Sequence, residues 1–309
     1  MEFSHVPVLL EEALDYLKVS PGGVFVDTTL GGGGHASEIL KRLMPGGILV
    51  GMDRDRDALE AASRKLKEFG PAFIPVHANF ANIAAVLAGL KIKKVNGFLF
   101  DLGVSSFQLD NPARGFTYNE DVLLDMRMDT SCELTAAQLV NTLSENELAA
   151  IIKNFGEERW SRRIAAKIVN ARETEGEIKT TGRLVDIIKE AIPARFRREG
   201  GHPARRTFQA LRIAVNNELK NIEQGIRQAI PLLTDGGRIV VITFHSLEDR
   251  LVKRIFKENQ GECQCPPSLP QCVCDFENKN IRVITSKAVT PRAEEVMNNP
   301  RARSARLRA

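Results

Sequence analysis

Residues 24–43 read VFVDTTLGGGGHASEILKRL. A short β-branched and aromatic run, Val24 to Asp27, leads into four consecutive glycines, and a stretch with helical character follows from His35 to Leu43. Such residues favour strands, and glycines permit a sharp turn, so the segment predicts a strand, a turn and a helix. In a doubly wound sheet the backbone approaches a ligand at this turn. A tight strand-to-helix turn without a ligand would use the same residues.

The same alternation of strand and helix patterns continues along the first hundred residues. Further strands are expected at 48–53, 72–76 and 97–101, with helices at 8–18, 57–69 and 83–90. Strands that alternate with helices at this spacing predict a parallel sheet built from βαβ units.

The pattern then becomes helical before strands return near the end of the chain. Helices are expected at 136–143, 145–153, 158–172, 181–191 and 206–230, and strands at 238–243, 281–284 and 305–308. We therefore expect an α/β fold with a Rossmann-like core formed by residues 1–108 and 207–309. An α-helical domain, residues 109–206, is expected to be inserted into that core.

The composition is that of a soluble globular protein. The chain has 309 residues, of which 43% are hydrophobic, 27% charged and 6% aromatic, and so small an aromatic share predicts no obvious stacking platform for single-stranded RNA. The N-terminus shows no signal peptide, and no stretch approaches the roughly 20 apolar residues of a membrane span. We expect a cytoplasmic protein with no membrane association.

Positive charge is concentrated in two segments. The net charge is only +4, but seven Lys or Arg stand against two Glu between Arg195 and Lys220, and six against two from Lys287 onward. Either segment alone is compatible with an ordinary solvated surface. Together they favour a polyanionic partner, because Lys and Arg displace counterions from phosphates.

An acidic residue at the end of the second strand points to a nucleoside ligand. Asp53 lies 22 residues after Gly31, and a carboxylate there can accept hydrogen bonds from ribose hydroxyls. Nicotinamide enzymes share this geometry. The run from Gly31 to Ala36 fits the dinucleotide pattern G-x-G-x-x-G poorly, which favours S-adenosylmethionine (SAM), a ligand without phosphate.

Two further polar residues follow this edge of the expected sheet. Asp101 ends the fourth strand, where a carboxylate can bind a cofactor or an acceptor amine, or can cap a turn. His35 is either a ligand contact or the first residue of a helix. The residues alone leave both alternatives open.

Longer motifs carry a resemblance to a known family. They are GGH at 33–35, DLGVSS at 101–106, QLD at 108–110, RGF at 114–116, LDMRMD at 124–129, GEER at 156–159, RTFQALRI at 206–213 and FHSLEDR at 244–250. Over nearly the whole chain, from residues 5–10 to 299–304, the sequence resembles the bacterial small-subunit ribosomal RNA methyltransferase H family (MraW-like). Phe107 departs from this pattern, since many members have proline there.

The resemblance implies a class I SAM-dependent methyltransferase that modifies the exocyclic N4 of a cytidine in the decoding region of 16S ribosomal RNA, within the small ribosomal subunit. It implies that SAM is held by Gly33, Gly34, His35, Asp53, Phe80, Asp101 and Gln108. An aromatic ring at Phe80 can pack against adenine. The inserted helical domain is expected to recognise substrate, with Arg159, Arg162 and Arg163 among its basic residues.

The catalytic residues are a hypothesis based on position. DNA amino-methyltransferases carry an Asp/Asn/Ser-Pro-Pro-aromatic motif after the fourth strand, and that motif is absent here, so DNA is not the expected acceptor. We expect Asp101 to close the cofactor side of the reaction centre and Ser105 or His245 to touch the base. A buried histidine that begins a helix is the alternative for His245.

Four cysteines in a proline-rich loop suggest a possible metal site. Cys263, Cys265, Cys272 and Cys274 could hold a structural zinc ion, although their spacing departs from the usual C-x-x-C. The alternative is a reduced surface loop. Cys132 stands apart and is expected to pack inside the protein.

Two other classes of function stay open at this point. One is a nicotinamide-dependent oxidoreductase on the same kind of sheet, against which the glycine run and the basic segments count. The other is a non-catalytic RNA-binding assembly factor with a vestigial SAM fold, against which Gly33, Gly34, Asp53 and Asp101 count. The sequence does not distinguish a monomer from a homodimer.

Overall fold

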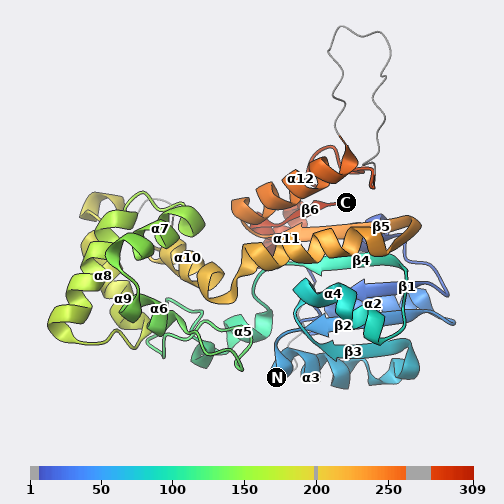
Figure 1. Ribbon diagram of the computed structural model, residues 1–309, viewed down its shortest axis with the longest axis horizontal. Helices are drawn as coiled ribbons and strands as arrows, with labels where there is room; N and C mark the ends of the chain where they lie inside the picture. Colours follow the sequence, from blue (N-terminus) through green and yellow to red (C-terminus); the bar gives the residue numbers. More distant parts are fainter. Residues whose placement is uncertain (1–6, 198–200, 262–279) are drawn as a thin grey trace, which may run out of the picture. The chain divides into compact units, whose positions relative to one another are not determined.

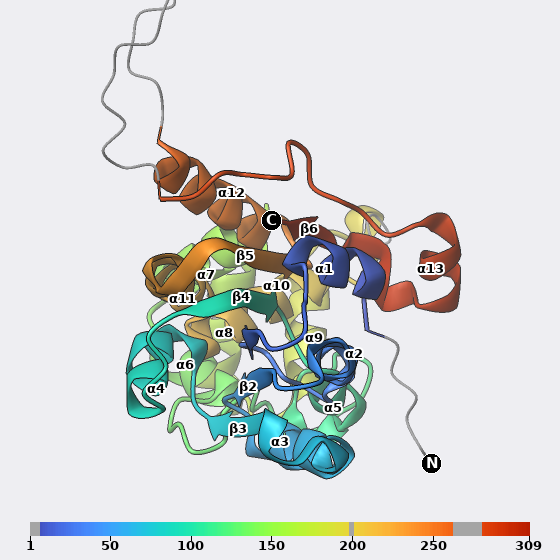
Figure 2. The ribbon, with the colours of Figure 1, turned by 90° about the vertical axis from the view of Figure 1, so that its right-hand side faces the viewer.

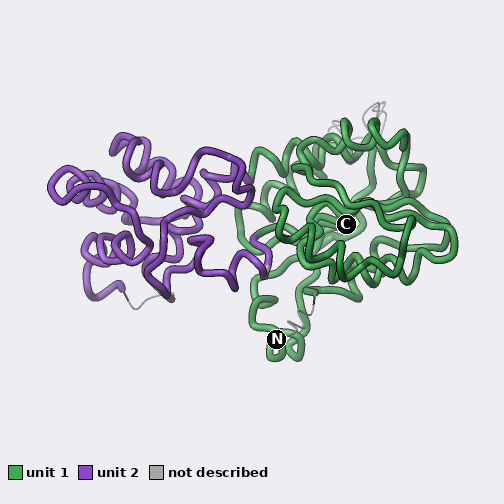
Figure 3. Tube along the Cα trace, turned by 90° about the horizontal axis from the view of Figure 1, so that it is seen from below, with its two compact units in different colours: residues 1–103, 219–309 green, residues 104–218 purple. Residues whose placement is uncertain are grey.

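The computed structural model describes residues 7–197, 201–261 and 280–309. The chain divides into two compact units (Figure 3). Unit 1 consists of residues 1–103 and 219–309, and unit 2 of residues 104–218. Unit 2 extends beyond the expected insertion, residues 109–206, at both of its ends.

Unit 1 is built on one six-stranded sheet with the order β3-β2-β1-β4-β5-β6 (Figure 1). The strands are β1 Val24–Asp27, β2 Ile48–Asp53, β3 Phe73–His77, β4 Val95–Asp101, β5 Leu233–Thr243 and β6 Arg306–Arg308. The first five are parallel, and β6 runs antiparallel to β5. The strand order reverses between β1 and β4, and ligands of doubly wound sheets bind at the carboxyl ends of the strands beside such a switch point.

Helices cover both faces of this sheet (Figure 2). One face carries α1 Leu10–Leu17, α2 Gly34–Leu43 and α3 Arg56–Lys65, and the other carries α4 Ile83–Gly89, α11 Glu218–Ala229 and α12 Ser246–Gln260. Side chains alternate between the faces along each strand: Phe25 packs with the first layer and Val26 with the second. The result is the expected α/β architecture, and the expected parallel sheet is confirmed.

Unit 2 consists of helices joined by irregular segments, and its described residues include no strand, only an isolated bridge between Leu123 and Thr180. Its helices are α5 Ser106–Asp110, α6 Ala136–Thr142, α7 Glu145–Gly156, α8 Ser161–Glu175, α9 Thr181–Ala191 and α10 Arg205–Asn216. Capping boxes at Thr135 and Ser144 fix the starts of α6 and α7, because each side chain accepts from the backbone three residues on.

Shorter elements complete the chain. They are α13 Ala293–Asn298 and the 3-10 turns η1 Lys67–Ala72, η2 Phe80–Asn82, η3 Pro112–Arg114, η4 Ala194–Phe196, η5 Ile230–Leu232 and η6 Pro300–Ser304. Among the described residues no helix has both the length and the apolar character needed to cross a membrane.

The LDMRMD motif at 124–129 is an irregular segment held by two side chains of unit 2. Asn216 Oδ1 accepts from the Met128 amide at 2.8 Å, and its Nδ2 donates to the Met126 carbonyl at 2.7 Å. Arg114 donates to the Arg127 and Met128 carbonyls at 3.0 and 2.9 Å. Since buried backbone groups need partners, this clasp replaces the hydrogen bonds that regular structure would have supplied.

Three expectations from the sequence were wrong. The single helix expected at 206–230 is two helices, because Asn217 adopts a left-handed conformation (φ 49°) between α10 and α11. Residues 281–284 form no strand; instead the amides of Ile284 and Thr285 donate to the Ala309 carbonyl. Cys132 is exposed rather than packed inside.

The short strand β6 is anchored by ion pairs to α12. Arg308 forms a fork on Asp249, with its Nε 2.7 Å from Oδ1 and its Nη2 3.1 Å from Oδ2, and Arg306 adds a bond of 3.1 Å. Burial opposes ionisation of Asp249, but the hydrogen bonds and charges of the two arginines outweigh it, so the pKa of Asp249 lies below its ordinary value. These bonds explain how a three-residue strand keeps its place.

Candidate functional site

Three carboxylates gather at the carboxyl edge of the unit 1 sheet. Asp27, Asp53 and Asp101 are the last residues of β1, β2 and β4, which are neighbours in the sheet. Asp53 also organises the glycine turn: its Oδ2 accepts from the Gly31 amide at 2.8 Å, and its Oδ1 from the Asp55 amide at 2.9 Å. The sequence predicted Asp53 and Asp101 at this edge.

The turn itself depends on two of its glycines. Gly33 has a φ of 71° and precedes α2, a conformation that residues with a Cβ adopt at a cost of about 1–2 kcal/mol. At Gly34 a Cβ would lie 2.6 Å from Cγ of Pro7. The absence of a side chain at Gly34 therefore lets the preceding segment pack onto the turn, a need that is separate from any ligand.

Asp101 contacts two neighbouring side chains, and one of its two carboxylate oxygens takes no part in these contacts. Its amide donates to Thr29 Oγ1 at 2.6 Å, and its Oδ2 lies 3.5 Å from Nδ1 of His35. The other ring nitrogen of His35 lies 3.1 Å from the Val8 carbonyl, which can only accept, so that nitrogen carries a proton. Oδ1 of Asp101 is buried and has no hydrogen-bond partner within the described structure.

Burial, aided by neighbouring negative charges, raises the pKa of all three carboxyl groups. Burial, aided by the charge of Asp53, raises the pKa of Asp27 to about 7. Burial, with the charges of Asp27 and Glu248, raises the pKa of Asp101 well above its ordinary value. Burial also raises the pKa of Asp53, although the Asp55 and Gly31 amides oppose it. A cationic ligand would relieve this cost, whereas a phosphate would add to it.

Phe80, predicted to stack on adenine, is largely buried. It is 9% exposed and meets Phe100 edge-on, with ring centroids 5.8 Å apart and planes at 77°. Gly225 of α11 allows this packing, because a Cβ there would lie 2.8 Å from the ring. The ring therefore forms part of the core, and any contact with a ligand uses what remains exposed.

His245 follows β5 and caps helix α12. Its Nδ1 accepts from the Glu248 amide at 3.4 Å, which places the proton of a neutral ring on Nε2. Nε2 in turn lies 3.2 Å from Oε1 of Glu248, a fully buried carboxyl group. Both ring nitrogens thus face Glu248, the arrangement expected of a histidine that begins a helix.

Ser105 and Gln108 belong to unit 2, where they form a reciprocal helix cap. Ser105 Oγ accepts from the Gln108 amide at 3.3 Å, and Gln108 Oε1 accepts from the Ser105 amide at 3.1 Å. This capping box starts α5 and uses the carbonyl of Gln108. A SAM contact from Gln108 and a base contact from Ser105 remain predictions.

Two site residues were missed by the sequence reasoning. Asp27 ends β1 as Asp53 ends β2, and the same rule of position could have identified it. Thr29 fixes Asp101 through its hydroxyl, and no sequence signal marks that contact. The four cysteines of the expected zinc site, Cys263, Cys265, Cys272 and Cys274, lie outside the described residues.

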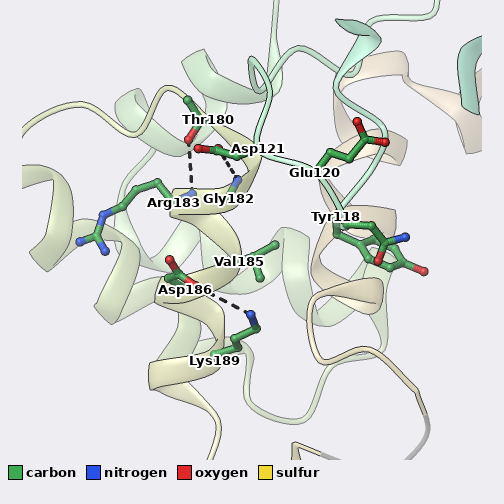
Figure 4. A pocket seen from close by; sticks show the side chains of 10 residues that line it. Tyr118, Glu120, Asp121, Thr180, Gly182, Arg183, Val185, Asp186 and Lys189 are labelled. Atoms are coloured by element: carbon green, nitrogen blue, oxygen red, sulfur yellow. Dashed lines mark hydrogen bonds and ion pairs between the residues drawn. The ribbon is translucent and has the colours of Figure 1, made fainter. Parts of the chain in front are cut away.

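Unit 2 contains an open depression of about 440 Å³ (Figure 4). Several of its charges are already engaged: Asp121 Oδ1 accepts from the Gly182 amide at 2.9 Å, and Asp186 lies 3.8 Å from the Lys189 ammonium. Mixed charges that satisfy one another provide no clear preference for a ligand. The carboxylates at the edge of the unit 1 sheet form the better candidate site.

The comparison with family models agrees with this reading of the fold. The model described as the MraW methylase family matches residues 2–309. The chain belongs to the MraW methylase family. The resemblance drawn from the motifs is thereby confirmed.

Curated relatives within the MraW methylase family are similar over their full length. The ribosomal RNA small subunit methyltransferase H of Halothermothrix orenii is 54% identical and is aligned over 98% of this chain and 97% of its own. The proteins of the same name from Geobacter sulfurreducens and Symbiobacterium thermophilum are 55% and 53% identical, each over 100% of this chain and over 99% and 96% of their own.

The comparison with solved structures also finds similar chains. Fibrillarin from Aeropyrum pernix, solved with bound S-adenosyl-L-methionine, has 10% identity and a TM-score of 0.39 over 97% of this chain and 74% of its own. A likeness this weak adds nothing to the assignment made from the family.

Proposed function

We propose that this chain is a SAM-dependent methyltransferase that methylates small-subunit ribosomal RNA, and that its acceptor is the N4 amine of a cytidine in the decoding region of 16S rRNA. The family membership supports methyl transfer. The observation that carries the proposal is the convergence of the buried Asp27 with the partly buried Asp53 and Asp101 at the switch point of the sheet, beside a glycine turn. The expected location is the cytoplasm, where the small subunit is made.

The carboxylates at this edge of the sheet suit SAM better than a dinucleotide. SAM carries a positive sulfonium and an ammonium group, which the carboxylates at the ends of β1, β2 and β4 would attract. The buried Oδ1 of Asp101, without a hydrogen-bond partner among the described residues, is an acceptor suited to an N–H donor. The pyrophosphate of a nicotinamide cofactor would bring negative charge to the same place, which counts against an oxidoreductase.

Individual residues have distinct roles in holding the donor. Each carboxylate oxygen of Asp53 already accepts one backbone N–H, from Gly31 or from Asp55, and has a second lone pair left. These two remaining lone pairs suit the two ribose hydroxyls. Gly33, Gly34 and His35 shape the turn around the donor, and the remaining exposed part of Phe80 suits the adenine. Gln108 is proposed as a further contact. When bound, SAM supplies an electrophilic methyl group.

The acceptor side requires help from the protein, because the N4 lone pair of cytosine is delocalised into the ring. A carboxylate that accepts an N–H of the amine orients the nitrogen and can later take its proton. Asp101 is the residue we assign to this task, because it ends β4 at the carboxyl edge of the sheet and its Oδ1 has no hydrogen-bond partner among the described residues. Contact of Ser105 or His245 with the base is a secondary proposal, and both side chains also cap helices.

The test uses radiolabelled SAM and three acceptors: small ribosomal subunits that lack the modification, the naked RNA from them, and duplex DNA. The expected result is label in the RNA of the subunit, mapped to one N4-methylcytidine. Asp101→Asn should reduce the rate at least 100-fold, the usual order of effect for a lost general base. Asp15→Asn, an exposed change on α1, is the matched control and should leave the rate unchanged.

Equilibrium dialysis with SAM separates the parts of the proposal. Wild type that binds SAM but labels none of the three acceptors would refute the substrate. Failure to bind SAM would refute the cofactor and revive a non-catalytic RNA-binding role. Ser105→Ala or His245→Ala with unchanged rate and intact SAM binding would remove that residue from the reaction.

A further inference from the structure

Two aromatic rings emerge together at the surface of unit 2. Trp160 precedes helix α8 and Phe196 ends the turn η4, and their ring centroids lie 5.5 Å apart with planes inclined by 40°. Both side chains are partly buried against the hydrophobic core of unit 2. The rings therefore have a fixed support and an accessible side.

Three exposed arginines lie over these rings. The Arg159 guanidinium carbon is 4.1 Å from the Phe196 centroid and 5.1 Å from that of Trp160. Arg163 lies 5.5 Å from the Trp160 centroid and Arg195 lies 4.6 Å from that of Phe196. We call these five residues the arginine–ring cluster. Arg162 and Arg197, also exposed, flank it in sequence.

Two of the three arginines in the cluster, Arg163 and Arg195, carry charge that is available to a ligand. Within the part of the chain that the structure describes, neither Arg163 nor Arg195 forms an ion pair with a carboxylate. Three other cations of unit 2 are paired with glutamates: Lys167 with Glu190, Lys179 with Glu177 and Arg183 with Glu175. The cluster therefore combines available charge with flat, delocalised groups.

We propose that the arginine–ring cluster binds unpaired nucleotides of RNA. Arginines neutralise phosphates and release their counterions, while guanidinium planes and aromatic rings stack on bases. A duplex shields its base faces and offers only phosphates and sugar edges to such a surface, so the cluster suits splayed or looped nucleotides. The choice of RNA as the polyanion rests on the proposed function; the preference for unpaired bases rests on the rings.

Trp160 provides the measurement, because it is the only tryptophan of the chain. The full chain is titrated with a single-stranded RNA oligonucleotide, with the same sequence as a duplex, and with heparin, a polyanion without bases. Stacking on or beside the indole should quench its fluorescence, so we expect saturable quenching by the single strand and little by heparin at equal occupancy. Occupancy is measured separately by fluorescence anisotropy of labelled ligands.

Variants separate the charges from the rings. Arg163→Gln with Arg195→Gln should weaken single-strand binding and reduce the slope of log K against log salt by about 1.4, from about 0.7 for each lost phosphate contact. Phe196→Leu should weaken binding roughly fivefold or more while duplex binding changes little. Lys167→Gln with Lys179→Gln is the matched control and should leave the slope unchanged. Thermal unfolding followed by circular dichroism verifies that each variant folds.

The proposal is overturned if heparin or duplex quenches Trp160 as strongly as the single strand, or if the arginine double variant keeps the slope of the lysine control. The titration contains no SAM and scores no methyl transfer. Its failure therefore leaves the proposed methylation standing, and a protein that binds unpaired RNA here without methylating it refutes only the proposed function.

Discussion

Replacement of Asp27 by asparagine should change how the stability of unit 1 depends on pH. The unfolding free energy of the variant, relative to that of wild type, should increase as the pH rises. Asp27 is 1% exposed, and burial raises its pKa from an ordinary value of 3.8 to about 7. The folded state therefore holds the proton more tightly than the unfolded state. The stability that the neutral carboxyl contributes is complete below pH 3.8 and is lost as the pH rises to about 7.

The magnitude follows from the pKa change. Each pKa unit corresponds to about 1.36 kcal/mol, so wild type loses about 3 kcal/mol through this group between pH 5 and pH 8. Asparagine has no such ionisation, and its Oδ1 can still accept from the Thr29 amide, as Asp27 does at 3.1 Å. The difference in unfolding free energy, variant minus wild type, should thus increase by about 3 kcal/mol over this range.

Urea unfolding at pH 5 and pH 8 measures this difference. Circular dichroism follows both units, and fluorescence of Trp160 follows unit 2 alone, which identifies the transition of unit 1. Asp15→Asn, on the exposed side of α1, should show no comparable dependence on pH. A difference for Asp27→Asn that stays constant from pH 5 to pH 8 would refute the raised pKa of Asp27 and its origin in burial.

Three further variants test other parts of the structure. Arg308→Ala leaves the buried Asp249 without its forked partner and should cost unit 1 about 3–5 kcal/mol in urea unfolding at pH 7, with a smaller loss near pH 3, where Asp249 is protonated in the variant; an equal loss at both pH values would contradict the assignment. Asn216→Ala removes the two bonds that Asn216 contributes to the clasp on the LDMRMD segment and should destabilise unit 2 by roughly 2–3 kcal/mol, so an unchanged Trp160 transition would speak against a stabilising role for these bonds. Gly33→Ala places a Cβ on a residue with left-handed φ, 3.3 Å from Cβ of Ala62, and should lower the unfolding free energy by about 1–2 kcal/mol and weaken SAM binding. SAM binding that is unchanged in equilibrium dialysis would contradict a role of the turn in holding SAM.

The elements that the sequence predicted well are those governed by local patterns. β1 and β2 have the expected bounds, and the ends of α2 and α9 lie within one residue of expectation, because hydrophobic periodicity and glycines act over short distances. The rule that strand ends meet at one edge then placed Asp53 and Asp101 together without knowledge of the tertiary structure. The hydrogen bond from the Gly31 amide to Asp53 is an addition that the structure makes, since the sequence predicted only a ligand contact for Asp53.

What the sequence could not supply depends on contacts between distant segments. The left-handed Asn217 divides a helical pattern that has no obvious break, and residues 281–284 have strand composition but lack a partner strand. Composition alone indicated no aromatic platform, yet the fold brings Trp160 beside Phe196. His245 and Ser105 each cap a helix, and this role likewise depends on backbone geometry that residue type does not specify.

The division of unit 1 into two stretches of sequence has a consequence for how the protein is made. β4 can pair with β1 early, but its other edge must wait for β5, which leaves the ribosome about 130 residues later, or from several seconds to half a minute at about 5–20 residues per second. Unit 2 is continuous in sequence, so it can complete its own core during that delay. Until then an unpaired strand edge of the nascent chain is open to wrong partners, and the speed of translation through residues 104–218 sets how long that exposure lasts.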